Sequence, residues 1–439
     1  MHYNKIFIIL LLLIIYKPGF SQEILTKDTA VALALENNYG IKVANNNVLR
    51  AKNNSSIYNS NYLPRVSANA GANYNNSNYD TEFQDGSTST RDNAAYSVYN
   101  ASLAVNYTLF DGFGRSYNYK ILKETHKLSE LEARQIIENT LLQLFIGYYE
   151  VARLTEDELN LITFLEISKN RLLRAQYNYE YGQSTKLDIL NAEVDLNNDK
   201  IKHRNIKKLL ANSRHNLNFV LGRDVNTVFE VDTSIAYTPG LILEDLISRT
   251  KNDNVFLLQA NKNIEISNYQ IKVSKSGWMP TVGVSGSYGY NNVANDASFT
   301  TANSTIDGFS AGINLSWNIF DGGMTKTRVQ NAKISVENSE ILKQQTEQSL
   351  ERDVRNAWEA LQNALFVLEA EGKNVETNKR NFARSEEQYK LGQITSIDFR
   401  LAQVNLLNAA TNLNRAKFDT KIAELALLQV SGQLLNAEF

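Results

Sequence analysis

Two segments of the chain alternate between apolar and polar positions with the period of a β-strand. From residue 99 to 109, and again from 309 to 319, every second residue is apolar or aromatic. The positions between them are mostly Asn, Ser, Thr and Gly. One apolar face and one small polar face suit a wall between lipid and water. The same alternation also fits a soluble sandwich with one wet face, so the strands alone leave the class open.

A second strand precedes each of these segments. Residues 66–74 and 282–290 alternate less cleanly but carry tyrosines, and together the strands predict β-hairpins over 64–110 and 280–320. The polar stretches 80–94 and 291–307 are predicted as long connections. Four strands cannot close a barrel, and open edges in hydrocarbon leave backbone groups unpaired at several kcal/mol each. The chain is therefore predicted to oligomerise, and two, three or four protomers all give barrels of known size.

Most of the remaining chain has helical periodicity. The segments from about 115 to 181 and from about 326 to 391 lack proline, are rich in helix formers and space apolar residues three and four apart. Each such helix would reach roughly 100 Å. Shorter helices are expected at about 38–62, 186–221, 254–278 and 396–431. Their summed lengths in each half nearly equal one long helix, which suggests two short helices stacked end to end beside it.

The apolar stripes of these helices are narrow, and the faces between them are rich in Asn, Gln, Lys and Glu. Such helices are wet on two sides, as in the wall of a hollow tube. A filamentous coiled-coil scaffold would show the same pattern and stays open as an alternative. The chain has no apolar run of 18 residues beyond its first residues, so any contact with a membrane interior falls to the strands.

The sequence contains an internal duplication. A shift of 210 residues carries Leu-Phe-Asp-Gly at 109–112 onto Ile-Phe-Asp-Gly at 319–322, and a shift of 216 pairs the segments before the strands. This period is too long for a solenoid of short repeats. We predict a first structural repeat over 22–221, a linker over 222–253 and a second repeat over 254–439. The turn residues that the shift pairs are Tyr179 with Tyr389, Gly182 with Gly392, Asp188 with Asp398, and Gly222 with Gly432.

Helix ends can be placed at two of these turns. Thr185-x-x-Asp188 and Thr395-x-x-Asp398 fit capping boxes that open a new helix. Each follows a glycine suited to end the preceding helix. The chain is thus predicted to reverse direction at Gly182 and at Gly392.

The first residues predict secretion. Lys5 precedes an apolar run from 6 to 16, and small residues follow at Gly19 and Ser21. The run is too short for a spanning anchor, so we predict a signal peptide over 1–21 cleaved after Ser21, with an N-terminal anchor as the alternative. Cleavage leaves 43 basic against 47 acidic residues. This balance favours no nucleic-acid partner, and no cysteine is present.

The sequence contains no arrangement that indicates an enzyme. His203 and His215 lie twelve residues apart, which is not a same-face metal spacing on a helix. Gly112-x-Gly114 lacks the later glycine and the βαβ unit of a nucleotide site. We therefore predict no catalytic residue, no metal and no cofactor.

At this point the residues resemble a known family, the TolC-type outer-membrane efflux proteins, over essentially the whole secreted chain. The features that carry the resemblance are Leu25-Thr26, the run from Ala30 to Asn38, the Leu-Pro and Met-Pro strand starts, the corners Phe110-Asp111-Gly112 and Phe320-Asp321-Gly322, and the two Tyr-x-x-Gly-x-x-x-x-x-Asp turns.

The resemblance implies an α+β membrane protein that assembles as a homotrimer. Four strands per chain would complete a 12-stranded β-barrel in outer-membrane lipid, above a long periplasmic α-helical barrel. Residues 222–253 and the chain ends would form a mixed equatorial belt. The family exports small molecules from an inner-membrane pump through a periplasmic adaptor protein. A duct dedicated to type I protein secretion is the alternative within the same fold, and a non-conducting envelope scaffold the alternative outside it.

The resemblance also assigns roles to the turns and strand ends. The turns at Gly182 and Gly392 would form the closed periplasmic tip, with Tyr389 hydrogen-bonded to Asp188 on the neighbouring hairpin and Asp398 in a ring of three carboxylates. The alternative role of both aspartates is that of helix caps only. Two departures from the family weaken this gate, because Ile394 replaces an arginine and Leu401 a second ring aspartate. Tyr107 and Trp317, paired by the repeat, are expected to lie in the membrane-interface aromatic belt.

Overall fold

The computed structural model describes residues 24–296 and 299–436, so the predicted signal peptide lies outside the described residues. The chain divides into two compact units. The helical unit contains the described residues up to Asn46, Leu131–Leu258 and those from Gln345 onward. The strand unit contains Asn47–Glu130 and Gln259–Gln344.

The helices follow the duplicated pattern. The long helices α4 and α8 and the return helices α5 and α9 begin and end within two residues of their predicted limits, which confirms those helices. The helix bounds are α2 Lys27–Asn37, α3 Tyr39–Asn54, α4 Gly114–Glu180, α5 Lys186–Val220, α6 Leu243–Asp253, α7 Val255–Ser276, α8 Met324–Lys390 and α9 Ser396–Val430.

Helix α3 is shorter than predicted. It ends at Asn54 instead of near Tyr62, and a short 3₁₀ helix follows at Ile57–Asn59. The run Asn53-Asn54-Ser55-Ser56 explains the early end, because Asn and Ser compete for backbone hydrogen bonds and favour caps. The Ser56 hydroxyl accepts the Tyr58 amide and caps the 3₁₀ turn. The short helices therefore do not sum to the length of α4, which is 67 residues long.

The predicted end-to-end stacking of short helices is nevertheless present, and one asparagine makes each junction. The Asn38 side-chain amide donates to the carbonyl of Val220, the last residue of α5, at 2.8 Å, while its carbonyl accepts the Gly40 amide of α3 at 2.8 Å. Asn254 repeats both contacts, with Val430 of α9 at 2.7 Å and with the Phe256 amide of α7 at 2.9 Å. Each asparagine thus satisfies one helix start and one helix end.

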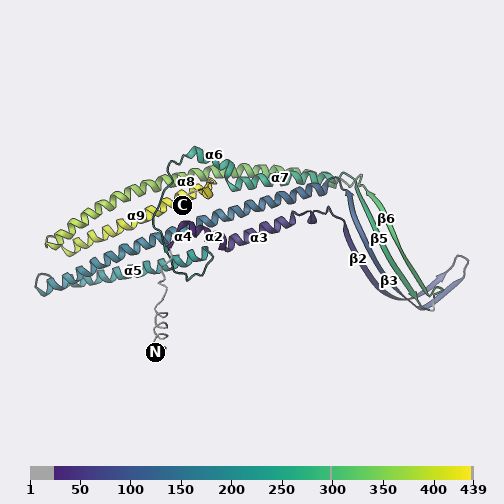
Figure 1. Ribbon diagram of the computed structural model, residues 1–439, viewed down its shortest axis with the longest axis horizontal. Coiled ribbons are helices and arrows are strands. Elements are labelled where there is room, and N and C mark those ends of the chain that lie inside the picture. The colour runs from purple at the N-terminus through teal and green to yellow at the C-terminus, as the bar shows by residue number, and fades with distance from the viewer. Residues whose placement is uncertain (1–23, 297–298, 437–439) are drawn as a thin grey trace, which may run out of the picture. The chain divides into compact units, whose positions relative to one another are not determined.

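Four antiparallel strands form the sheet of the strand unit in the order β2-β3-β5-β6 (Figure 1). The register places Leu103 beside Tyr288 and Tyr107 beside Val284, so the apolar positions of adjacent strands share one face. Strands β2 and β6 each have one unpaired edge in the described chain. The strand bounds are β2 Arg65–Glu82, β3 Thr88–Phe110, β5 Thr281–Asn295 and β6 Asn303–Ser316.

The long polar connections predicted between the strands are wrong. β2 continues to Glu82 and β3 begins at Thr88, and the ladder pairs Asp80 with Thr90. In the second hairpin β5 reaches Asn295 and β6 begins at Asn303. Backbone hydrogen bonds between strands form whatever the side chains are, so polar side chains on both faces do not end a strand. The polar composition of these stretches therefore indicated strands exposed to water and not a loop.

The end of the last strand also differs from the prediction. The alternation extends to Ile319, but β6 stops at Ser316, which pairs with Thr281. β5 supplies no residue beyond Thr281 because Pro280 precedes it, and β6 has no second neighbour in the described chain. β3 lies between two strands and continues to Phe110.

The core of the helical unit surrounds a buried tyrosine. The Tyr148 hydroxyl of α4 donates to the Leu25 carbonyl at 2.8 Å and accepts the Asp232 amide at 3.0 Å. It thereby fixes the parallel pair β1 (Ile24–Leu25) and β4 (Glu230–Val231). Burial raises the pKa of Tyr148 to about 12. The segment at Leu25 and the 222–253 segment are therefore held to the middle of α4.

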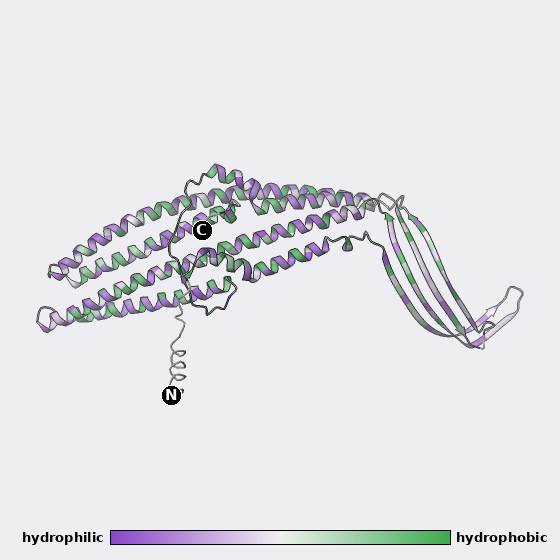
Figure 2. Cartoon of the chain, viewed as in Figure 1, coloured by the Kyte–Doolittle hydropathy of each residue, from purple (hydrophilic) through white to green (hydrophobic). Residues whose placement is uncertain are grey.

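The long helices remain amphipathic throughout, with hydrophobic and hydrophilic residues mixed along each of them (Figure 2). Among the described residues, no helix combines the length and apolarity needed to cross a membrane.

Candidate functional site

The two helical hairpins of the helical unit end in matching turns. Gly182 and Gly392 have φ of +70° and +73°, the left-handed conformation that favours glycine. The Gly182 amide donates to the Tyr179 carbonyl at 3.0 Å, and Gly392 repeats this with Tyr389 at 3.1 Å. Each glycine therefore ends its long helix as the sequence predicts.

Both tip aspartates cap the return helices. Asp188 accepts the Thr185 amide at 3.1 Å, and Asp398 accepts the Thr395 amide at 3.2 Å. Both capping boxes are present, which confirms that prediction. Asp398 is exposed and Asp188 half-buried, so capping leaves the Asp398 carboxylate open to solvent.

The expected hydrogen bond between Tyr389 and Asp188 is absent within the described chain. The Tyr389 ring stacks on the buried Phe399 of α9 instead, with centroids 4.7 Å apart. Arg174 of α4 lies 5.0 Å from the centre of the Tyr389 ring and donates to the Lys390 carbonyl at 2.6 Å. The two hairpins are therefore joined at the tip by Arg174, which no pattern in the sequence identifies.

Arg174 places a guanidinium at the tip, where Ile394 replaces the arginine that the family resemblance implies. It comes from the opposite hairpin, so no comparison of the turns alone would have located it. Tyr179, the repeat equivalent of Tyr389, is exposed and has no such cation over its ring in the described chain. The two tips are thus alike in backbone and different in their side-chain contacts.

We expect Arg174→Ala to loosen the contact between the two hairpin tips and Tyr389→Phe to leave it nearly intact. The phenylalanine keeps the stack on Phe399 and the face for Arg174, whereas alanine removes the hydrogen bond and the cation–π contact, together worth about 1–3 kcal/mol. Hydrogen exchange of the backbone amides at the two turns measures the difference. Faster exchange in Tyr389→Phe than in Arg174→Ala would contradict this assignment.

A second, more buried set of contacts joins the hairpins behind the tip. Arg400 of α9 makes a bidentate ion pair with Asp199 of α5, with Nη1 to Oδ2 at 2.6 Å and Nη2 to Oδ1 at 2.7 Å. Ser168 of α4 donates to the same carboxylate at 2.6 Å. Side-chain exposure is 15% for Arg400 and 2% for Asp199, so the pair is largely shielded from water. We call Arg400, Asp199 and Ser168 the clasp.

Further polar groups surround the clasp. Gln403 donates to Ser168 at 2.9 Å and to the Phe164 carbonyl at 3.2 Å. Asp195, one turn before Asp199, pairs with the buried Arg171 and lies 3.6 Å from Arg400. Arg171 keeps two nitrogens without a partner in the described chain. The helices α4, α5 and α9 are therefore joined here by charge and hydrogen bonds, beside the apolar cluster that contains Leu161, Phe164 and Leu407.

The contacts of the clasp stabilise the ionised form of the Asp199 carboxylate. Burial acts to raise the pKa of Asp199, but the hydrogen bonds from Arg400 and Ser168 and the charge of Arg400 outweigh it and lower the pKa below its ordinary 3.8. No sequence signal identified these residues, because charged residues on wet helix faces are common in this chain.

The strand-to-helix corners lie where the sequence places them. Asp111 accepts the Arg115 amide at 2.8 Å, and Asp321 accepts the Thr325 amide at 2.8 Å, so each aspartate caps a long helix. Gly112 has a φ of +67°, and a Cβ there would lie 2.6 Å from Met279. The remaining corner residues differ between copies: Phe110 stacks edge-on against Phe113, Phe320 is 85% exposed, and Gly322 is surrounded by open space.

The two predicted interface aromatics have different settings. Tyr107 lies within β3 and has Arg115 5.9 Å from its ring centre. Trp317 follows β6 and donates from its indole to the Trp278 carbonyl at 3.1 Å. Both lie at the helix-proximal end of the sheet.

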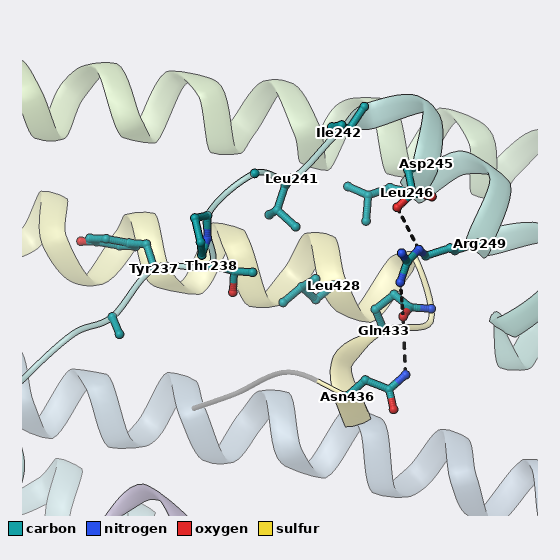
Figure 3. A pocket seen from close by; sticks show the side chains of 13 residues that line it. Tyr237, Thr238, Leu241, Ile242, Asp245, Leu246, Arg249, Leu428, Gln433 and Asn436 are labelled. Carbon is teal, nitrogen blue, oxygen red and sulfur yellow. Dashed lines mark hydrogen bonds and ion pairs between the residues drawn. The ribbon is translucent and has the colours of Figure 1, made fainter.

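The 222–253 segment frames a pocket of about 450 Å³ against α9 (Figure 3). Tyr237 and Leu241 line one side, while Arg249 of α6 bridges Asp245 at 2.9 Å and Gln433 at 3.4 Å. These polar groups satisfy one another, which suits a structural contact. Within the described ranges no group of three or more His, Cys, Asp or Glu residues can hold a metal ion.

Known proteins share this architecture. A crystal structure of the Campylobacter jejuni CmeC outer membrane channel superimposes with a TM-score of 0.75 at 18% identity, covering 93% of this chain and 86% of CmeC. The outer membrane protein TolC of Vibrio cholerae is 24% identical over 297 residues, which cover 67% of this chain and 68% of that protein. The probable efflux pump outer membrane protein TtgC of Pseudomonas putida is 24% identical over 356 residues, 78% of this chain and 71% of TtgC.

The duplicated helical hairpins and four antiparallel strands share the fold of the CmeC outer membrane channel. The sequence model of the outer membrane efflux protein family matches residues 30–223 and 246–433, most of the chain. The chain belongs to the outer membrane efflux protein family. It is an efflux channel of a Gram-negative outer membrane with a periplasmic extension.

Proposed function

We propose that this chain forms a homotrimeric duct that receives small molecules from an inner-membrane pump through a periplasmic adaptor and releases them outside. The unpaired edges of β2 and β6 carry this proposal. Open edges in hydrocarbon cost several kcal/mol per unpaired group, so neighbouring protomers must pair them. Three copies of the four strands give a closed barrel of 12 strands.

The proposed domain organisation follows the duplication. The repeats over 22–221 and 254–439 each supply one β-hairpin and one helical hairpin, and residues 222–253 with the chain ends form a belt. The pairing of β1 with β4 and the contact of Tyr148 with Leu25 support this belt. Tyr107 and Trp317 would anchor the barrel at the headgroup level, where aromatic side chains concentrate.

The hairpin tips are the proposed gate and adaptor-binding end. Tyr179 and Gly182 on one hairpin, and Tyr389 and Gly392 on the other, would surround the axis with Asp188 and Asp398 close by. Arg174 and the clasp would hold the two hairpins of a protomer together in the closed state.

Deletion of the gene tests the proposed duct. Cells that lack the protein should accumulate dyes and antibiotics, and the complementing gene should restore their export. Native mass spectrometry of the purified protein should give a trimer beginning at Gln22. Unchanged accumulation of every tested compound with loss of one secreted protein would replace drug efflux by protein secretion, and a stable monomer would overturn the barrel.

Asp398→Asn should weaken block of the channel by multivalent cations from the periplasmic side. Three exposed carboxylates at one constriction attract cations, and asparagine removes that charge. The helix cap survives in part, since the amide oxygen still accepts the Thr395 amide. Current block by trivalent cations in planar bilayers measures the effect, and Asp188→Asn serves as the matched control at a half-buried cap. Equal block in all three proteins would exclude a carboxylate ring at Asp398.

A further inference from the structure

The helix segments that adjoin the sheet are strongly basic. Only two acidic residues, Asp111 and Asp321, occur in these segments, and both cap helices. The segments are residues 47–64, 111–123, 266–280 and 321–335. The whole chain has a net charge of −2, so this excess is local. The ten cations of these segments, which we call the collar, are Arg50, Lys52, Arg115, Lys120, Lys123, Lys272, Lys275, Lys326, Arg328 and Lys333.

A ladder of rings and cations runs from the apolar face of the sheet onto α4. Arg115 lies 5.9 Å from the ring centre of Tyr107 and 5.3 Å from that of Tyr62. Tyr62 meets Tyr119 edge-on at 6.0 Å, and the ammonium of Lys123 lies 4.4 Å above Tyr119. Tyr107 belongs to the apolar row of β3, so the ladder starts on the face that suits lipid.

Two more lysines converge between α4 and α7. The rings of Tyr117 and Tyr269 stack with centroids 6.4 Å apart. The ammonium groups of Lys120 and Lys272 lie 5.3 to 5.7 Å from these ring centres. The second long helix has Thr327 and Gln330 in place of Tyr117 and Lys120, so it does not repeat the part of this cluster that α4 supplies.

These lysines have no anionic partner in the part of the chain that the structure describes. Lys120, Lys123 and Lys272 form no ion pair there, whereas the nearby Glu124 is taken by Lys127 and Lys262 at 2.9 Å each. Ring faces hold an ammonium in place but leave its donors free. Three oriented cations beside an apolar surface would attract an anion whose other end is apolar.

We propose that the collar binds the phosphate groups of anionic phospholipids in the periplasmic leaflet of the outer membrane, chiefly through Lys120, Lys123 and Lys272. The acyl chains would then lie along the apolar face that contains Leu103, Val105 and Tyr107. This inference rests on the proposed insertion of the sheet into the membrane. Clusters of basic residues next to a membrane-spanning segment bind anionic lipids at about 1 kcal/mol per cation.

The test compares lipid binding to the purified full-length protein in neutral detergent. Native mass spectrometry titrates phosphatidylglycerol against phosphatidylcholine for the wild type and for Lys120→Gln/Lys123→Gln/Lys272→Gln. Each cation contributes about fivefold, so the triple variant should lose about a hundredfold in phosphatidylglycerol affinity. Phosphatidylcholine binding should stay unchanged.

The matched control removes three exposed lysines of α5, in Lys200→Gln/Lys207→Gln/Lys208→Gln, and should bind phosphatidylglycerol like the wild type. Arginine at the three collar positions should restore binding. Equal loss in the control, unchanged affinity in the collar variant, or displacement of the lipid by equimolar inorganic phosphate would each overturn the proposal. Conductance in phosphatidylcholine bilayers tests the duct separately, because it needs no anionic lipid.

Discussion

Arg400→Ala is expected to open the resting channel and to lower its melting temperature. Removing the guanidinium leaves the carboxylate of Asp199, whose side chain is 2% exposed, without its bidentate partner. Loss of one partner of a buried ion pair costs about 3–5 kcal/mol. For a unit of this size that corresponds to roughly 6–20 °C. Single-channel conductance and far-ultraviolet circular dichroism provide the two measurements.

The control for this variant is Arg384→Ala, which removes an exposed arginine of α8 at no cost to the clasp. Arg400→Lys should fall between wild type and alanine, because an ammonium keeps the charge but not the bidentate geometry. The assignment fails if Arg400→Ala lowers the melting temperature while the resting conductance stays at the wild-type level. The clasp would then stabilise the fold without holding the gate.

The same contact predicts a response to acid. Asp199 has a lowered pKa in the folded protein, so its contribution to stability is present above the ordinary value of 3.8 and disappears as the pH falls through the lower, folded value. The conductance of the resting channel should therefore be constant near neutrality and rise, through loss of the clasp, only below about pH 3.8. In Arg400→Ala this acid-dependent rise should be missing.

Gly222→Ala is expected to destabilise the helical unit strongly. Gly222 has a φ of +68°, and an added Cβ would lie 2.6 Å from the carbonyl carbon of Asn37. The left-handed conformation costs alanine about 1–2 kcal/mol. Relief of the clash must move the junction between α5 and α3 and break the bond from Asn38 to Val220, at about 1–3 kcal/mol more.

Gly240→Ala is the matched control, because its φ is +71° and nothing lies within 4 Å of the added Cβ. Gly240→Ala should lose only the free energy of unfolding that comes from the left-handed conformation, about 1–2 kcal/mol. Gly432→Ala, the repeat equivalent, should behave like Gly222→Ala because its Cβ would lie 2.8 Å from the Asn254 amide nitrogen. Melting temperatures and the yield of folded protein from membranes give the comparison, and equal values for Gly222→Ala and Gly240→Ala would exclude the junction as the cause.

Local chemistry explains what the sequence by itself determined. Helical periodicity without proline specified α4 and α8 almost to the residue, and the glycine and capping-box patterns specified both hairpin turns. The strict alternation specified the face of β3, and the duplication predicted two matched halves. All of these signals depend on neighbours a few residues apart in the chain, which is why a sequence displays them.

The tertiary structure decided the contacts between distant segments. Arg174 reaches the hairpin that ends at Gly392, and Arg400 reaches Asp199 across 201 positions. Strand ends were decided in the same way, because β6 stops where β5 offers no further partner, whatever the alternation of its side chains. The residues next to a charged side chain on a solvent-exposed helix do not reveal its partner. The pairing depends on how the helices pack and not on spacing along the chain.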